Sequence, residues 1–311
     1  MPAIKIGLIG GSGLGEALTS SADGEQFFPT TPFGKPSAAV ICTEWEGLPV
    51  AVLARHGSGH VYGPSKVPYR ANIYALKQLG VTHIIASGAV GSLRENVHPG
   101  ELLVPDQVID KTYKRENSFF GEGVAVHVEF DQPFCPNLRR VILQAASNVH
   151  VKVHEKGTYI CMEGPQFSTV AESNLHRSWG GDVIGMTCMP EAKLAREAEI
   201  CYALITLPTD FDCWKPHPAD RPKRELLAEI ISNMQRASGL AIDLIKASLR
   251  KIVQVAGGKG EKLDCPCQSS LELGIWTDRS KIAPATVRQL QPLLGKYFTK
   301  ESRSSQEGSG L

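Results

Sequence analysis

Short apolar runs alternate with segments of helical periodicity along most of the chain, and this alternation limits the folds open to it. The apolar runs cover residues 4–9, 38–42, 49–54, 81–86, 102–109, 157–162, 182–186 and 200–207. Pro68 opens a predicted helix ending near Gly80, and a second has Leu138, Val141, Ile142 and Ala145 on one face. Alternating strands and helices predict an α/β fold.

The rest of the chain adds helices and no composition break. A capping-box pattern at 168–172 and Pro190 each begin a predicted helix, a long amphipathic helix covers 225–252, and the last helix covers 284–298. We therefore expect one domain over 1–298, with a flexible connector at 257–261 and a helical region at 222–298 closing the site. The tail 299–311 has almost no apolar residues and is predicted to be disordered.

Charge and apolar content favour a small-molecule partner. Lys and Arg number 33 against 32 Asp and Glu, so the formal charge of +1 gives no broad attraction to nucleic acid or to an anionic membrane. No run reaches the ~18 apolar residues that a spanning helix needs, and none at the start resembles a signal peptide. We expect a cytoplasmic protein that binds neither nucleic acid nor membrane.

Two loops rich in glycine and polar donors follow predicted strands. Residues 10–15 form the loop Gly-Gly-Ser-Gly-Leu-Gly, which satisfies neither the dinucleotide fingerprint nor the P-loop but offers N–H groups and a hydroxyl to an anion. Arg55 and His56 end the strand 49–54, and Arg binds phosphate well. Either loop is also readable as a plain turn with surface donors. Together they indicate an oxyanion site.

Two carboxylates and two aromatic rings follow the apolar run 200–207, in the segment 209–214. Asp210 and Asp212 would lie at the carboxyl end of a buried strand, where open α/β sheets bind ligands. Aromatic rings cover the faces of a flat heterocycle while carboxylate oxygens accept from its N–H groups. The alternative is that Asp210 caps the next helix and Trp214 belongs to the core.

Several blocks together resemble the methylthioadenosine phosphorylase branch of the trimeric purine nucleoside phosphorylase family. They are 10–15, 55–57, 64–67, 91–94, 133–136, 163–168, 186–187 and 209–214, in the family's order over about residues 4–245. The resemblance implies a single α/β domain with a mixed, partly barrel-like sheet, a homotrimer with sites near subunit interfaces, and cleavage of an N-glycosidic bond by inorganic phosphate. It implies no cofactor, because phosphate is a co-substrate, and no metal.

The resemblance also assigns roles to residues. Phosphate would be held by Ser12, Arg55, His56, the backbone of Ala89, and Thr187. The base and ribose would meet Phe167, Ser168, Met186, Asp210 and Asp212, and the 5′ end would be lined by His60 and by His127 of a neighbouring subunit. Asp210 would be the catalytic acid with Asp212 as its partner, since burial beside a like charge raises the pKa of a carboxyl.

Base-edge chemistry favours 6-aminopurines, because family members using 6-oxopurines typically carry Asn at the Asp210 position. Open alternatives are a methylthioinosine or ordinary purine nucleoside phosphorylase, a hydrolase, a nucleotide-binding module and a non-catalytic nucleoside-binding protein. Gly88 stands where relatives usually place a donor to phosphate, and the polar segment 222–224 is unexpected beside a methylthio group.

Six of the eight cysteines are expected in the core. They lie in apolar or mixed runs, and they are Cys42, Cys135, Cys161, Cys188, Cys201 and Cys213. Cys265 and Cys267 resemble a Cys-x-Cys element that can form a disulfide in some relatives; here both are expected reduced, without further ligands for a metal.

Overall fold

The computed structural model describes residues 4–216, 222–257 and 265–298. Eleven strands form one sheet: β1 Ile6–Gly10, β2 Glu25–Phe27, β3 Val40–Trp45, β4 Leu48–Ala54, β5 His83–Ser92, β6 Leu102–Leu103, β7 Gln107–Asp110, β8 Val153–His154, β9 Thr158–Cys161, β10 Val183–Gly185 and β11 Cys201–Phe211. The α-helices are α1 Leu14–Ser21, α2 Tyr69–Gln78, α3 Pro136–Ala145, α4 Val170–Ser178, α5 Cys188–Glu197, α6 Lys223–Gly257, α7 Pro284–Gln289 and α8 Gln291–Leu294. The predicted α/β class is confirmed.

The sheet is mixed and branches at β5. Its main path runs β2-β3-β4-β1-β5-β10-β9-β7, and β11 pairs along β5 to start a second arm through β6 to β8. The pairs β1–β4, β1–β5 and β5–β11 are parallel, whereas β3 and β4 form an antiparallel hairpin. Strand β1 and the segment 84–86 of β5 contain only apolar residues and glycine, as expected where helices cover both faces of a sheet.

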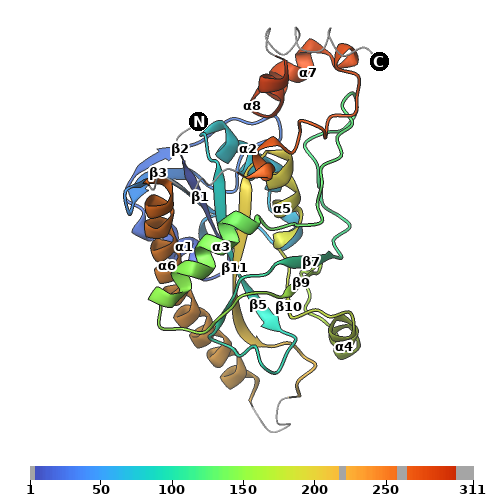
Figure 1. Ribbon diagram of the computed structural model, residues 1–311. Coiled ribbons are helices and arrows are strands. Elements are labelled where there is room, and N and C mark those ends of the chain that lie inside the picture. The colour runs from blue at the N-terminus through green and yellow to red at the C-terminus, as the bar shows by residue number, and fades with distance from the viewer. Residues whose placement is uncertain (1–3, 217–221, 258–264, 299–311) are drawn as a thin grey trace.

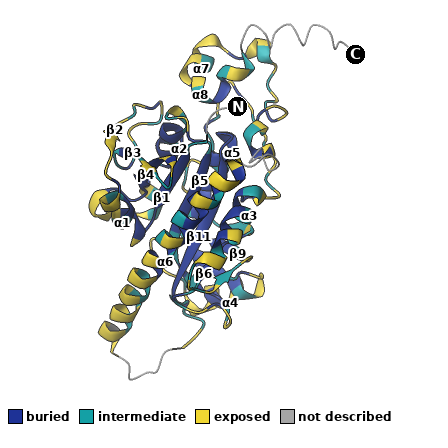
Figure 2. Cartoon of the chain, turned by 60° about the vertical axis from the view of Figure 1, so that its left-hand side comes forward, coloured by how far each residue is buried: buried dark blue, intermediate teal, exposed yellow. Residues whose placement is uncertain are grey.

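Helices on the two faces define two cores. Helices α1, α3 and α6 pack on one face, where Leu18, Leu138 and Leu244 are fully buried. On the other face lie α2, α5 and α8, with Ile73 and Leu194 fully buried. The strands between them are buried along most of their length, whereas the first half of α6 is largely exposed (Figure 2). No helix among the described residues is long and apolar enough to cross a membrane.

Three predicted elements differ from the structure. The strand predicted over 81–86 continues as β5 to Ser92, because β11 pairs with it that far. The single strand predicted over 102–109 is split into β6 and β7 around Pro105, whose nitrogen has no hydrogen to donate to a ladder. The predicted helix 284–298 is divided into α7, α8 and a short 3-10 turn, because Pro292 cannot donate to the carbonyl four residues earlier.

The C-terminal region reaches opposite ends of the molecule. Helix α6 begins near the carboxyl end of β11, whereas α7 and α8 lie at the other end (Figures 1 and 2). The segment 265–298 packs there against the end of α5, where Lys296 pairs with Glu199 at 2.6 Å. The closing role assigned to residues 222–298 stays a prediction. The predicted tail 299–311 lies outside the described residues, as does the connector 257–261 except for Gly257.

The expected core position of Cys135 and Cys201 is confirmed, because both are buried. The expectation that Cys265 and Cys267 lack further ligands was wrong. Cys135, Cys201, Cys265 and Cys267 bring their sulfur atoms within 4.8 Å of one another, and all four residues are buried. All four are free thiols. Cys265 and Cys267 therefore have further sulfur neighbours that sequence spacing did not reveal, because they lie 64 and 66 positions after Cys201.

Candidate active site

The carboxyl ends of β1, β4 and β5 bring the predicted oxyanion residues together. Gly10 pairs with Ala54 across β1 and β4, and Ile9 pairs with Ala86 on β5. A Cβ atom on Gly11 would lie 2.6 Å from Arg55 Nη1 and 2.8 Å from the Ser87 carbonyl oxygen. The loop before α1 thus touches both neighbouring strands, and only glycine fits at position 11.

Arg55 is committed to a partner that the sequence did not indicate. Its Nε and Nη2 atoms donate to Glu191 of α5 at 2.7 Å each, and Nη1 donates to the Ser87 carbonyl at 2.7 Å. Both side chains are fully buried. Burial opposes the charge of Arg55, but Glu191 outweighs it and the pKa of Arg55 is raised. Glu191 therefore occupies Nε and Nη2, the two atoms with which Arg55 could bind phosphate bidentately. The Nη1 atom faces the loops that contain Gly11 and Gly88.

One further residue predicted for the oxyanion site, Thr187, lies near that Nη1 side, across Gly88. A Cβ on Gly88 would lie 3.7 Å from Thr187 Oγ1 and 4.0 Å from Arg55 Nη1. Ala89 is the next residue of β5, and Thr187 precedes α5 at its N-terminal end. Ser12 is half-buried in the loop between β1 and α1. The structure therefore places Thr187, Gly88 and Arg55 around one small space.

The two histidines after β4 differ in exposure. His56 is buried, its ring stacks on that of His60 at 4.1 Å, and its Nδ1 lies 2.7 Å from the Tyr62 carbonyl oxygen. Burial and then Arg55 lower the pKa of His56 to about 4. The ring is therefore neutral at pH 7, and Nδ1 carries the proton because a carbonyl only accepts. Nε2 is then an acceptor, so His56 lacks the expected second donor. His60 is exposed.

A β-bulge at Thr209 aims the carboxylates at the end of β11. Pro208 pairs with Val90 and Asp210 with Gly91, so Thr209 is an extra residue on β11. Its hydroxyl donates to Asp210 Oδ1 at 2.8 Å, and its carbonyl accepts from Asn233 Nδ2 of α6 at 2.9 Å. Asp210 therefore belongs to a strand and caps no helix.

Asp210 is a carboxyl group that readily holds a proton. Burial raises its pKa from 3.8 to about 6, the Thr209 hydroxyl opposes this shift, and the charge of Asp212 adds to it. The raised pKa expected from desolvation and a like charge is confirmed in direction. The group has the pKa that an acid needs near neutral pH.

Asp212 offers an acceptor without a donor. It is 8% exposed, and its Oδ2 has no hydrogen-bond partner among the residues that the structure describes. A Cβ on Gly91 would lie 3.3 Å from Asp212 Cβ, so the glycine gives the side chain its room. Trp214 closes this end, because its Nε1 donates to the Ser92 carbonyl at 2.8 Å. A buried lone carboxylate oxygen is the acceptor that an amino group would satisfy.

The residues predicted to contact the base lie on loops, and not all of them are enclosed. The Ser168 carbonyl accepts from Cys213 Sγ at 3.2 Å, which ties it to the carboxylate segment. Met186 is half-buried, and Arg115 donates to its carbonyl at 2.5 Å. Phe167 is 81% exposed. The described chain thus brings Ser168 to Cys213, the residue after Asp212, and leaves the Phe167 side chain exposed.

His127 lies with the C-terminal segment. Its ring contacts Trp276 with centroids 4.8 Å apart, and its backbone N–H donates to the Gly274 carbonyl at 2.8 Å. That segment is at the opposite end from the carboxylates of the same chain (Figure 1). The position agrees with the assignment of His127 to a neighbour's site, which stays a prediction.

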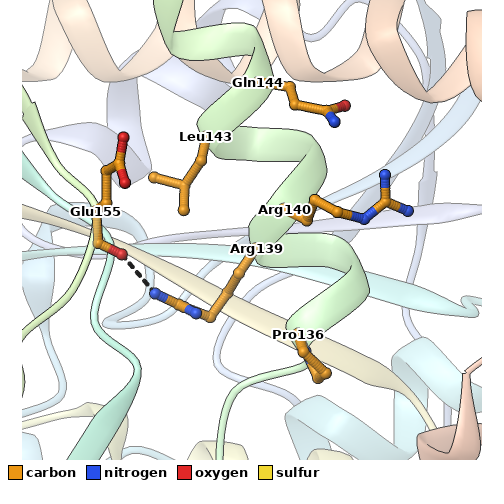
Figure 3. Close-up of a pocket in the computed structure, with 6 residues that line it drawn as sticks. All are labelled: Pro136, Arg139, Arg140, Leu143, Gln144 and Glu155. Carbon is orange, nitrogen blue, oxygen red and sulfur yellow. Dashed lines mark hydrogen bonds between the residues drawn. The ribbon is translucent and has the colours of Figure 1, made fainter.

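Two hollows differ in their relation to these residues. One, of about 280 Å³, lies between the end of β11 and the first half of α6, and is lined by Pro99, Thr209, Asp210, Phe211, Leu226, Glu229, Ile230, Asn233 and Arg236. The other, of about 330 Å³, lies on α3 (Figure 3). There Arg139 donates to the Glu155 carbonyl at 2.6 Å and to the Pro105 carbonyl at 2.8 Å, so it serves the fold and not a ligand.

Comparison with known proteins identifies the class that this fold and site define. The family model for the phosphorylase superfamily matches residues 5–250. The chain therefore belongs to the phosphorylase superfamily.

Individual relatives have a more specific name. The S-methyl-5′-thioadenosine phosphorylase of Thermosynechococcus vestitus is 46% identical over 299 residues, which cover 94% of this chain and 99% of that protein. The protein of the same name from Geobacter sulfurreducens is 46% identical and covers 94% and 98%. A crystal structure of methylthioadenosine phosphorylase from an antarctic soil metagenomic library has a TM-score of 0.82 at 40% identity, covering 94% and 100%. The resemblance seen in the sequence is confirmed.

Sequence reasoning missed the residues that position the site. Glu191 follows Pro190 on α5, and most residues of this helix are buried. A carboxylate on a buried helix needs a cation as partner, and this was the available signal for the Arg55–Glu191 pair. Glu163 accepts from Ser65 and from the Tyr113 backbone at 2.8 Å, and with Arg115 it fixes the loop before Phe167. Asn233 carried no sequence signal, because its partner is a backbone carbonyl.

Proposed function

We propose that this chain catalyses the phosphorolysis of 5′-methylthioadenosine to adenine and 5-methylthioribose 1-phosphate. The observation that carries this function is the pair of carboxylates at the end of β11, with a pKa of about 6 at the half-buried Asp210 and an Oδ2 at the buried Asp212 that has no partner among the described residues. The relatives, named as phosphorylases of this nucleoside, support the same substrate.

Adenine fits the carboxylate end through its own donors and acceptors. Its 6-amino group is a donor that would pair with Asp212 Oδ2, and its N7 would accept the proton of Asp210. A 6-oxopurine would place an acceptor oxygen toward the same carboxylates. A buried mismatch of this kind discriminates by ~10⁴ or more, so we expect a sharp preference for the 6-aminopurine.

Phosphate fits the other end, around Arg55 Nη1, Thr187 Oγ1 and the loop that contains Ser12. The Arg55–Glu191 pair is close to neutral, so backbone N–H groups and the two hydroxyls carry much of the binding. The neutral His56 presents Nε2 as an acceptor, which suits the P–OH of a hydrogen phosphate. We assign phosphate as co-substrate and no cofactor to the reaction.

The chemistry proceeds by displacement at the anomeric carbon. A phosphate oxygen forms the new bond to C1′ as the C1′–N9 bond breaks, and the electron pair of that bond goes to the purine. Asp210 donates its proton to N7, so adenine leaves as a neutral molecule and Asp210 becomes a carboxylate. The sugar carries positive charge in the transition state, and the phosphate beneath it is both nucleophile and counter-charge.

We also propose a homotrimer with shared sites. His127 sits away from Asp210 of its own chain, and the exposed apolar side chains Phe167, Leu273 and Trp276 are suited to subunit contact. A neighbour's His127 would then complete the 5′ end beside His60. The cytoplasmic location stays a prediction.

Product analysis tests the proposed function directly. The chain is incubated with methylthioadenosine or methylthioinosine, with and without phosphate, and kcat/KM is compared. We expect adenine and methylthioribose 1-phosphate, formed only when phosphate is present. Release of free methylthioribose would identify a hydrolase. A preference for methylthioinosine would overturn the role of Asp210. The absence of turnover would support a non-catalytic nucleoside-binding protein.

A further inference from the structure

Four cysteines from three distant segments converge in the core. Cys135 is the N-cap of α3, Cys201 is the first residue of β11, and Cys265 and Cys267 flank Pro266 at the start of the C-terminal segment. All four residues are buried, at 8% exposure or less. The cluster lies at the opposite end of β11 from Asp210, so the proposed reaction makes no use of it.

The spacing of the sulfur atoms matches a metal tetrahedron. Cys135 Sγ lies 3.4 Å from Cys265 Sγ, Cys265 Sγ lies 3.3 Å from Cys267 Sγ, and all four atoms are within 4.8 Å of one another. Zinc–sulfur bonds of about 2.3 Å in a tetrahedron give sulfur–sulfur edges of about 3.8 Å. The observed separations bracket that value, so small side-chain rotations would admit the ion.

Donors around the cluster suit thiolates. The Leu138 backbone N–H donates to Cys135 Sγ at 3.4 Å, and Gln268 Nε2 lies 3.9 Å from Cys201 Sγ. The first turn of α3 also directs its positive end toward Cys135, which favours a negative sulfur there. Hydrogen bonds of this kind to ligand sulfur are a regular part of thiolate metal sites.

We propose that Cys135, Cys201, Cys265 and Cys267 bind one zinc ion as a closed tetrathiolate site. Binding replaces the four thiol protons by the metal, and no electron transfer is involved. Soft sulfur ligands in a tetrahedral set favour Zn²⁺ over harder cations. Because four protein ligands leave no open position, the site is structural and not catalytic.

The ion would fasten the C-terminal segment to the sheet. That segment otherwise holds through contacts such as Ser270 Oγ to the Arg196 carbonyl at 2.6 Å and the bridge between Ile275 and Val126. The bridge places Trp276 against His127. Zinc would therefore stabilise the strand contact beside His127 without touching the reacting atoms.

Metal analysis of the full chain, untagged and purified under reducing conditions, tests the proposal. Elemental analysis by inductively coupled plasma mass spectrometry should find about one zinc ion per chain. Replacing zinc by Co²⁺ should give the intense near-ultraviolet sulfur-to-cobalt bands and the visible bands of a tetrahedral tetrathiolate. Chelation should lower Tm by several degrees, and adding zinc back should restore it.

The variant C265S/C267S should lose the zinc, while the matched control Cys42→Ser should keep it, because Cys42 lies outside the cluster on β3. Should the double variant fail to fold, the cobalt spectrum of the unmodified chain decides. The proposal is overturned if the chain holds less than about a tenth of an equivalent after incubation with zinc. Two disulfides found by mass in freshly purified protein, or equal metal loss in the control, would overturn it as well.

Discussion

Asp210 combines a functional pKa with a cost in stability. Its carboxyl is half-buried, and burial raises its pKa from 3.8 to about 6. The folded chain therefore holds this proton more tightly than the unfolded chain does. The associated stability is present below pH 3.8 and is lost as pH rises through about 6. At neutral pH the folded state carries an unfavourable charge beside Asp212, and this is the stability cost of the proposed acid.

Asp210→Asn should separate these two effects. We expect activity on methylthioadenosine to fall ~10²–10⁴-fold, because Asn has no acidic proton to donate. The ratio of 6-amino to 6-oxo activity should fall as well. The same variant should be more stable than the parent at pH 8, by roughly 1–3 kcal/mol, and this gain should shrink toward pH 4.

Kinetics with both nucleosides and thermal unfolding across pH measure the two effects. Asp243→Asn is the matched control, since Asp243 is exposed on α6 and should change neither quantity. An unaltered substrate ratio would remove Asp210 from the base site. A variant less stable than its parent at pH 8 would contradict the burial cost.

Gly88 leaves space where a further phosphate donor fits. A Cβ there would have only ordinary contacts, at 3.7 Å to Thr187 Oγ1 and 4.0 Å to Arg55 Nη1. Gly88→Thr should therefore tighten phosphate binding about tenfold, as expected for one added hydrogen bond to a charged group. Calorimetric titration with phosphate measures the change. Gly88→Ala fills the same space without a hydroxyl, and equal tightening by Ala would contradict the argument.

At the scale of elements, α6 connects the two ends of the proposed site. A Cβ on Gly13 of the first loop would lie 2.7 Å from Met234 Cγ, so this helix packs directly on that loop. One residue earlier, Asn233 holds the bulge of β11 through the Thr209 carbonyl. One turn of α6 therefore contacts the oxyanion loop and the carboxylate segment together.

Asn233→Ala should loosen the bulge and misplace Asp210. We expect kcat/KM for methylthioadenosine to fall about tenfold, because a small misplacement of an acid is costly. Unfolding should change little, since a single partly exposed hydrogen bond contributes about 1 kcal/mol. Steady-state kinetics and thermal unfolding test this. Gln235→Ala on the exposed side of the same helix is the control, and equal losses in both variants would show that the bulge does not depend on Asn233.

Sequence periodicity located most elements but not the bonds between them. The runs at 200–207 and 81–86 indicated buried strands, yet their pairing as far as Ser92 and Phe211 depends on small residues such as Gly91, which admits Asp212. The Arg55–Glu191 pair and the four-cysteine cluster join residues far apart along the chain, and local patterns carry no record of such contacts. The carboxylate pair was predictable because both of its members lie in one short segment.

At the scale of the whole molecule, one chain lacks part of the proposed site. The carboxylates end β11 at one end of the molecule, and His127 lies with the C-terminal segment at the other (Figure 1). In a cyclic trimer each interface is heterologous, so a residue of one chain can complete the site of the next. Exposed Trp276 beside His127 is the apolar surface that such an interface would bury.

Mixing two impaired chains tests this arrangement. Asp210→Ala should be inactive. His127→Ala should lose most activity on methylthioadenosine while its own Asp210 and Asp212 stay intact. After unfolding and refolding together in equal amounts, about a quarter of the interfaces should join an intact Asp210 to an intact His127. Activity should therefore rise toward about a quarter of the parent value. A mixture no more active than the mean of the separately refolded variants would show that His127 does not complete the site of a neighbouring chain.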